Sequence, residues 1–399
     1  MRKILLLFLL ILPIIFSFAE VPTPAKFEYK YNTGTKYRIL SEVDENVYLN
    51  DVFSHNAKML NKIAVEIVGS ENGSGTMQAT LEMSEKITGN FSTYEVTEKY
   101  ESTYQQDRLG YCTVDKKYFI PMARDIPAFP DHELKPGDVW SGNGREVHDF
   151  RKGFNISEPY AFPVTVSYQY LGKDETGLYD LISIKYSVDH KTNFPKRNKD
   201  NYLQLARITG STIQIMKWDN KRGRAFSYSE EFNFVFELIF GDTIRFTGTA
   251  KGEVIEAEDI DKDKIAEEIL DSGLENVTVE KVEEGIKITI ENIQFLPDSA
   301  ILADVELEKL ETIIEILNKV PNNDLLIIGH TALAGTPEGR KTLSTQRAKS
   351  VAEYILSAGV RGEKQIRIQG KGAEEPIATN ATDEGRKKNR RVEIIILEN

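Results

Sequence analysis

Apolar and polar residues alternate along most of the stretch from residue 27 to residue 255. The period of two is clear at 77–83, 164–170 and 182–188, and it is longest in the series that contains Phe232, Phe234 and Phe236. Because successive side chains of a strand point to opposite faces, this pattern predicts antiparallel strands with one buried face. Turn-forming clusters at 72–75, 174–177 and 219–223 separate the alternating runs. We therefore expect an N-terminal region rich in β-structure.

Prolines interrupt this region at Pro121, Pro127, Pro130 and Pro136. Proline lacks the backbone N–H that a strand ladder needs, so the segment is expected to be a linker or a long loop. This predicts a boundary between two β-rich domains, residues 20–120 and 121–258. A single larger β-domain, in which 121–258 continues the first unit across a long loop, is the alternative.

Near residue 259 the spacing of apolar residues changes to the period of 3.6 that is typical of amphipathic helices. Three helices are predicted, with apolar faces formed by Ile265, Ile269 and Leu270; by Leu307, Leu310, Ile314 and Leu317; and by Ala348, Val351, Ala352 and Ile355. A hairpin at 277–290 and strands at 325–328, 366–368 and 392–397 alternate with these helices. The sequence therefore predicts an α+β multidomain protein, with one or two N-terminal antiparallel β-rich modules followed by a βαβαβ α/β sandwich at 259–399.

The N-terminus has the three parts of an export signal. Arg2 and Lys3 give a positive start, residues 4–16 are almost wholly apolar, and Ser17 and Ala19 are small residues before a cleavage point. The apolar run is shorter than the roughly 20 residues that span a bilayer as a helix. We expect residues 1–19 to be a cleaved signal peptide of an exported protein. An uncleaved inner-membrane anchor is the alternative.

Composition argues against several classes of function. Of 399 residues, 40% are hydrophobic and 28% charged, which is typical of a folded globular protein. The net charge of −12 argues against a general nucleic-acid binder, because phosphates require a basic surface. Cys112 is the single cysteine, so it is expected to be a buried thiol. The sequence shows neither metal-ligand spacing nor a catalytic motif, so we expect no cofactor, no metal and no enzymatic activity.

Three short motifs lie in order near the C-terminus. They are Gly329-His330-Thr331, then Leu343-Ser344 followed by Arg347-Ala348, and Gly385-Arg386 followed by Asn389-Arg390-Arg391-Val392. Over residues 286–396 the chain resembles the OmpA-like (OmpA/MotB C-terminal) peptidoglycan-binding domain family. The fold that this resemblance implies agrees with the helix and strand order predicted from periodicity. The N-terminal region resembles no family that we recognise.

The resemblance also implies a binding site for the diaminopimelate residue of the peptidoglycan stem peptide. In the family, a carboxylate after Gly-His-Thr holds the ammonium group of this residue, and the arginine of the second motif holds its carboxylate. This chain keeps Thr331, Arg347 and Arg390, but it has Ala332 in place of the family's Asp and Arg340 in place of its Asn. Both changes add positive character, so conventional diaminopimelate binding is expected to be weakened or lost.

Three interpretations of the altered site stay open: a stem peptide with a different diamino acid, a more anionic ligand, or a vestigial site retained for protein contacts. The neighbouring residues Arg386, Lys387, Lys388 and Arg391 are expected to be structural or solvated. His330 is expected to be a hydrogen-bonded loop anchor.

These observations predict a non-enzymatic protein of the cell envelope, located in the periplasm and open to association with the outer membrane. Its expected partner is peptidoglycan or another carboxylate-bearing envelope ligand, with outer-membrane or periplasmic proteins as further partners and no nucleic acid. The alternative is an outer-membrane β-barrel of the porin type, tethered to the cell wall by its C-terminal domain. Acidic residues within the alternating runs, among them Glu82 and Glu237, argue against this alternative.

Overall fold

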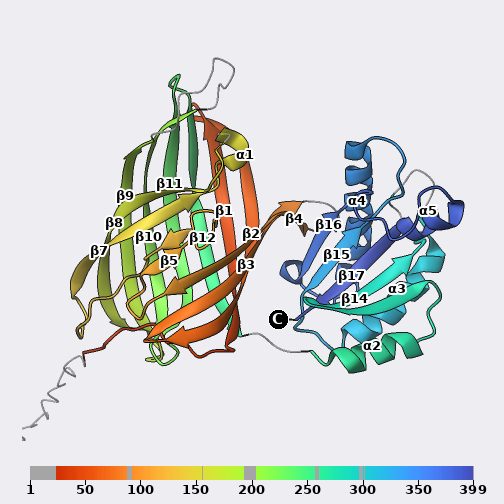
Figure 1. Cartoon of the computed structure of the whole chain (residues 1–399), viewed down its shortest axis with the longest axis horizontal. Coiled ribbons are helices and arrows are strands. Elements are labelled where there is room, and N and C mark those ends of the chain that lie inside the picture. Colours follow the sequence, from red (N-terminus) through yellow and green to blue (C-terminus); the bar gives the residue numbers. More distant parts are fainter. Residues whose placement is uncertain are drawn as a thin grey trace, which may run out of the picture.

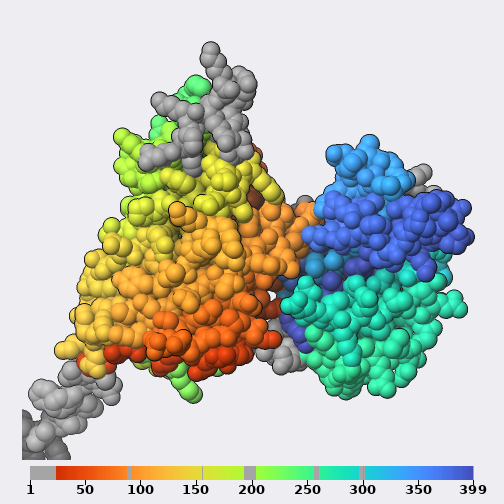
Figure 2. Space-filling view, in the orientation of Figure 1, coloured from red at the N-terminus to blue at the C-terminus, as the bar shows by residue number. Residues whose placement is uncertain are grey.

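The computed structural model describes residues 24–87, 92–154, 156–192, 204–256, 260–295, 300 and 302–398. The predicted signal peptide at 1–19 lies outside these residues. The chain forms two lobes in contact, an N-terminal one coloured red to green and a C-terminal one coloured teal to blue (Figure 1, Figure 2). None of the helices in the described segments is long and apolar enough to cross a membrane.

The N-terminal lobe is built on one curled antiparallel ladder, which we call the N-terminal sheet (Figure 1). Its spatial order is β5-β4-β3-β2-β1-β12-β11-β10-β9-β8-β7-β6. The elements of this lobe are β1 (Lys36–Leu49), β2 (Val52–Glu71), β3 (Ser74–Ile87), β4 (Thr93–Gln106), β5 (Cys112–Val114), β6 (Ala123–Arg124), β7 (Val139–His148), α1 (Arg151–Phe154), β8 (Tyr160–Lys173), β9 (Asp180–Lys191), β10 (Leu205–Asp219), β11 (Arg224–Leu238) and β12 (Thr243–Glu256).

Alternating burial along these strands confirms the period-two prediction. In β8, Val166 and Tyr168 are buried, whereas Thr165 and Ser167 are exposed. The predicted turns lie where β2 meets β3, where β8 meets β9 and where β10 meets β11. Cys112 is buried, as predicted, and burial raises the pKa of its thiol to about 11.

Strands from both sides of the predicted boundary share this ladder. β1 pairs with β12 along residues 37–49 and 244–256, so the two predicted modules meet edge to edge. The proline-bearing segment contains the two-residue strand β6 and is otherwise irregular. The continuous ladder favours the single β-domain over a division at residue 120, and the division of the chain into domains stays a prediction.

The C-terminal lobe is a two-layer structure, which we call the C-terminal sandwich. Its sheet has the order β13-β14-β17-β15-β16, in which β15 and β16 are parallel and the other neighbours are antiparallel. Its elements are α2 (Lys262–Asp271), β13 (Val277–Val282), β14 (Gly285–Glu291), α3 (Asp304–Leu317), β15 (Leu325–Gly329), α4 (Pro337–Ser357), the 3-10 helix η1 (Glu363–Gln365), β16 (Ile366–Gly370), α5 (Asp383–Asn389) and β17 (Arg391–Leu397). The predicted helices and strands are present in the predicted order, and η1 and α5 are present in addition to them.

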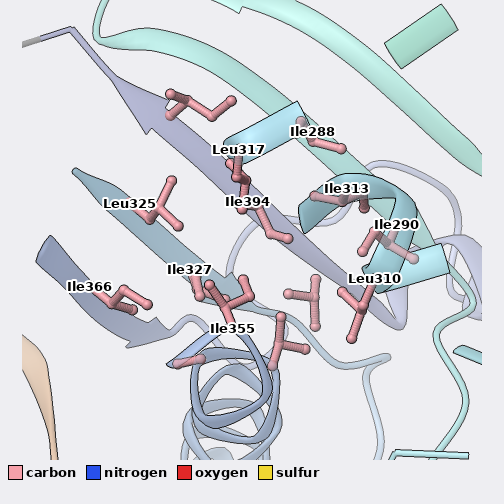
Figure 3. Close-up of a cluster of buried hydrophobic side chains, with 14 of the residues drawn as sticks. Ile288, Ile290, Leu310, Ile313, Leu317, Leu325, Ile327, Ile355, Ile366 and Ile394 are labelled. Carbon is pink, nitrogen blue, oxygen red and sulfur yellow. The ribbon is translucent and has the colours of Figure 1, made fainter. Parts of the chain in front are cut away.

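Aliphatic side chains fill the core between this sheet and helices α2, α3 and α4. Figure 3 shows Ile288 and Ile394 of the sheet near Leu310 and Ile313 of α3, with Ile355 of α4 below. None of these five side chains is more than 1% exposed. Since burying one such side chain contributes about 1.5–3 kcal/mol, this core firmly holds the strand ends that carry the motifs.

Helix α5 was not predicted from the sequence. It is seven residues long and rich in charge, and its buried residues are Gly385 and Asn389. No apolar period therefore marks it as a helix.

Backbone pairing and buried charges join the two lobes. β16 of the C-terminal sandwich lies parallel to β4 of the N-terminal sheet. Asp324, just before β15, forms ion pairs with Arg38 at 3.1 Å and with Lys62. Arg367 of β16 pairs with Glu82 of β3. Lys62 and Arg367 are buried, so these charges are part of the interior of the junction.

Candidate ligand site at the end of strand β15

The candidate site is assembled where β15 ends against α4. Gly329 is the last residue of β15, and a Cβ atom there would lie 2.0 Å from the carbonyl oxygen of Ser344. Only glycine lets α4 pack this closely on the strand end. Thr336 caps the helix, because its hydroxyl accepts a hydrogen bond from the N–H of Gly339 at 3.1 Å. The loop 330–336 is thus held between β15 and the start of α4.

Two polar motif residues hold the surrounding loops. The Ser344 hydroxyl accepts a hydrogen bond from the N–H of Gly372 at 2.9 Å. Asn389 accepts from the N–H groups of Ile377 and Ala378 at 2.9 and 3.0 Å. Both side chains are buried, so their place in the motifs is explained by loop geometry rather than by ligand contact.

The structure brings Arg347 and Arg390 together from different elements. Arg347 lies on α4, and Arg390 is the residue that ends α5. Burial and the nearby charge of Arg390 lower the pKa of Arg347. The guanidinium carbon of Arg347 lies 4.9 Å from the ring centroid of Phe295, within cation–π range. The Nε atom of Arg347 is buried and has no hydrogen-bond partner among the described residues.

The two positions that depart from the family pattern belong to the loop after β15 and the start of α4. Ala332 is 7% exposed. Arg340 turns back on the loop, where its Nη1 donates to the carbonyl of Gly335 at 2.6 Å. The Thr331 hydroxyl is buried and has no partner in the described part of the chain. The nearby carboxylate of Glu338 is exposed in the first turn of α4.

Arg386 and Arg391 form ion pairs, as predicted, whereas His330 holds its loop through its backbone, and its buried ring nitrogens form no hydrogen bond with the described residues. The His330 backbone donates to the carbonyl of Arg391 at 3.0 Å, and its ring Nε2 lies 3.5 Å from Oε1 of Glu393. The Nε of Arg391 donates to the same oxygen at 2.7 Å. Burial alone would raise the pKa of Glu393, but His330 and Arg391 lower it to about 2. Arg386 pairs with Asp383 inside α5.

This arrangement suits an oxyanion such as a carboxylate. Two neighbouring guanidinium groups offer planar sets of N–H donors, and no described acidic residue forms an ion pair with either of them. No group of three or more His, Cys, Asp or Glu in the described segments could hold a metal ion. The sequence motifs identified both arginines. They did not identify Phe295, which lies outside every motif.

A sandwich with this strand order, and with the three motifs at the end of β15, within α4 and along α5, has the arrangement of an OmpA-like domain. The OmpA family matches residues 294–390, and the chain belongs to this family. The N-terminal region has no family match.

Curated relatives share the same segment. The peptidoglycan-binding protein ArfA of Mycobacterium tuberculosis is 42% identical over 104 residues, which are 26% of this chain and 32% of ArfA. The outer-membrane lipoprotein YfiB of Pseudomonas aeruginosa is 32% identical over 122 residues, 29% of this chain and 72% of YfiB. A solved outer membrane protein from Borrelia burgdorferi B31 is 34% identical, covers 31% of this chain and 97% of its own, and has a TM-score of 0.26. The chain thus spans about a third of the length of ArfA.

Proposed function

We propose that this chain is an exported, non-enzymatic protein of the cell envelope whose C-terminal sandwich associates with peptidoglycan. Membership of the OmpA family supports this proposal, and the relative ArfA is named as a peptidoglycan-binding protein. The observation that carries it is the pair of Arg347 and Arg390, which has no acidic partner among the described residues.

In this proposal a carboxylate of the stem peptide, or of another envelope ligand, lies between Arg347 and Arg390. A charge-assisted hydrogen bond from a guanidinium contributes about 1.5–3 kcal/mol. A bound anion also offsets the desolvation cost and the repulsion from Arg390 that lower the pKa of Arg347. The unpaired hydroxyl of Thr331 is a candidate for one further hydrogen bond.

Free diaminopimelate is expected to bind weakly at this site. Ala332 offers no carboxylate to an ammonium group, and Arg340 adds a positive charge to the same loop. Losing one charge-assisted bond of about 1.5–3 kcal/mol lowers affinity roughly ten- to a hundredfold. Of the three interpretations of the altered site, we favour a more anionic ligand, because both carboxylate-binding arginines are retained while the ammonium-binding group is not.

We also propose the location and organisation of the chain. Residues 1–19 act as the export signal, 20–258 form one β-rich domain and 259–399 form the OmpA-like domain, in the periplasm. The porin-type alternative needs an apolar outer face. The exposed positions Thr165 and Ser167 of β8 and Glu231 and Glu237 of β11 are polar. Leu171 of β8 and Ile213 of β10 are exposed and apolar, so the outer face is mixed rather than a continuous apolar band, which supports the periplasmic location.

Co-sedimentation with purified peptidoglycan sacculi tests the function. Mature protein (20–399) is expected to pellet with sacculi of its own organism, and Arg347→Ala and Arg390→Ala are each expected to lower the affinity at least tenfold. Lys388→Ala is the matched control, because it removes one exposed positive charge from the same motif. Failure of the unaltered protein to pellet would contradict the proposal. An equal loss in Lys388→Ala would show that binding depends on general charge alone.

A further inference from the structure

The N-terminal sheet encloses a cavity of ≈ 610 Å³ on its inner side. This volume lies within the range of roughly 300–1,000 Å³ that is typical of small-molecule sites. Most of the lining is apolar, and its aromatic part includes Phe232, Phe234 and Phe236 on alternate positions of β11 and Phe246 of β12. The lining therefore suits the body of an apolar molecule.

Carboxylates interrupt this apolar lining. Glu45 of β1, Glu146 of β7 and Glu230 of β11 all face the cavity, whereas none of the described lining residues is Lys or Arg. Asp149 also lines the cavity, but it is paired with Arg151 at 2.6 Å. The described lining therefore carries three glutamates and no Lys or Arg to balance them.

The three glutamates differ in how many hydrogen bonds and ion pairs their carboxylates form within the protein. Glu146 accepts a hydrogen bond from the hydroxyl of Tyr186 and lies 2.9 Å from Nε2 of His148. Glu230 accepts one from the hydroxyl of Thr212 at 2.6 Å. The carboxylate of Glu45 has neither a hydrogen bond nor an ion pair among the described residues.

Burial acts on the two less satisfied glutamates. It raises the pKa of Glu45 to about 7. It also raises the pKa of Glu230, which the charge of Glu146 raises further. A positive charge in the cavity would counter both effects.

Strand register places an aromatic ring near the least satisfied carboxylate. Glu45 of β1 lies opposite Gly248 of β12, and Gly248 lies opposite Phe232 of β11. The three positions therefore share the inner face, and Gly248 lets β1 pack closely, since a Cβ atom there would lie 2.1 Å from the carbonyl oxygen of Asp44. Glu45 and Phe232 both line the cavity, so a cation bound there has a carboxylate and an aromatic ring as candidate contacts.

We propose that the cavity binds a small amphipathic amine, with its ammonium group at Glu45 and Glu230 and its apolar chain along the phenylalanines of β11. The ammonium group supplies the positive charge that the lining lacks. The apolar chain fills space that is otherwise lined by aromatic side chains. This ligand chemistry differs from that of the C-terminal site, where two arginines select an anion.

Three probes with the same chain and different head groups test this proposal. Mature protein is titrated by calorimetry with decylamine, decanol and decanoate below their aggregation concentrations. Decylamine is expected to bind at least tenfold more tightly than decanol, and decanoate most weakly. Glu45→Gln and Glu230→Gln are each expected to reduce this preference for the amine at least fivefold while leaving decanol binding unchanged.

Two controls keep the result interpretable. Glu231→Gln removes an exposed carboxylate from the outer face of the same strand and should leave the preference intact. Arg347→Ala should also leave amine binding unchanged, which separates this site from the C-terminal one. Each variant is compared with the unaltered protein by near-ultraviolet circular dichroism, and if one glutamine variant does not fold, the other provides the test. Equal affinity for amine and alcohol, tighter binding of decanoate, or no binding of any probe would overturn the proposal.

Discussion

Asp324→Asn is expected to uncouple the two lobes. The Asp324 carboxylate forms ion pairs with Arg38 and Lys62 of the N-terminal sheet, although it belongs to the C-terminal sandwich. Its side chain is 12% exposed, and those of Arg38 and Lys62 are 15% and 8% exposed. The amide keeps the shape of the carboxylate but leaves both cations without their anion. The buried guanidinium of Arg367 adds a third positive charge nearby.

The size of the effect depends on which cation can lose its proton. Removing one partner of a buried ion pair costs about 3–5 kcal/mol. Burial and the charge of Arg367 lower the pKa of Lys62 to about 7, so near neutral pH this lysine can release its proton at little further cost. Arg38 stays protonated, and its stranded charge dominates the loss. We therefore expect Asp324→Asn to lower the free energy of unfolding by about 3 kcal/mol, at the lower end of that range.

The pH dependence of this loss of stability follows from the protonation of Lys62. The variant lowers the pKa of Lys62 further, so below pH 7 the unaltered folded protein binds a proton that the folded variant does not. The difference in stability between the two proteins is therefore expected to grow as the pH falls from 8 to 6.

Urea unfolding with two optical probes measures this uncoupling. Both tryptophans, Trp140 and Trp218, lie in the N-terminal sheet, whereas α2 to α5 lie in the C-terminal sandwich. Tryptophan fluorescence and circular dichroism at 222 nm are expected to change together in the unaltered protein and to separate in Asp324→Asn. Asp189→Asn, which breaks an exposed pair with Arg207, is the control and should behave as the unaltered protein does. Coincident, unshifted transitions in Asp324→Asn would refute the reasoning.

Three further changes test the site and the cavity. Ala332→Asp is expected to raise the affinity for free diaminopimelate at least tenfold by calorimetry, and no gain would mean that the missing carboxylate is not what limits binding. Gly329→Ala places a Cβ atom 2.0 Å from the carbonyl of Ser344 and should lower the free energy of unfolding by about 1–3 kcal/mol, whereas Gly153→Ala, with open space around it, should not. The pKa of Glu45 rises from 4.5 to about 7 in the folded state, so the folded protein keeps a proton that the unfolded chain loses, and stability falls as the pH rises through this window. Glu45→Gln is therefore expected to match the unaltered protein at pH 4 and to exceed its unfolding free energy at pH 8 by on the order of 1 kcal/mol, and an equal difference at both pH values would count against the assignment.

Periodicity predicted the elements that have one apolar face. Apolar and polar residues alternate in β8 and β11 because one face of each strand is buried. Apolar residues recur with the helical period in α3 and α4 because each helix packs on a sheet. The pairing of β1 with β12 and that of β4 with β16 could not be predicted, since each joins residues that are far apart in the sequence. The residue pattern within each strand does not indicate which strand it pairs with.

The candidate site was predictable only in part. Arg347 and Arg390 stand in motifs, so the resemblance identified them, but the contact with Phe295 depends on how the chain returns to α4. The cavity glutamates gave no signal, because Glu45 and Glu230 occupy strands whose register alone decides which face each one joins.

The parallel contact between β4 and β16 gives the junction a preferred direction of mechanical strength. It is a short seam, in which Arg367 lies opposite Tyr94 and Ile368 opposite Glu95. If the C-terminal sandwich is anchored in the wall, tension along the strands loads these hydrogen bonds together, whereas tension across them opens the seam one bond at a time. The ion pair of Arg367 within the seam and the ion pairs of Asp324 also join the two lobes and oppose that opening. A junction built in this way resists sliding more than peeling, so under the proposed attachment to the wall the angle of pull would decide how long the two lobes stay together.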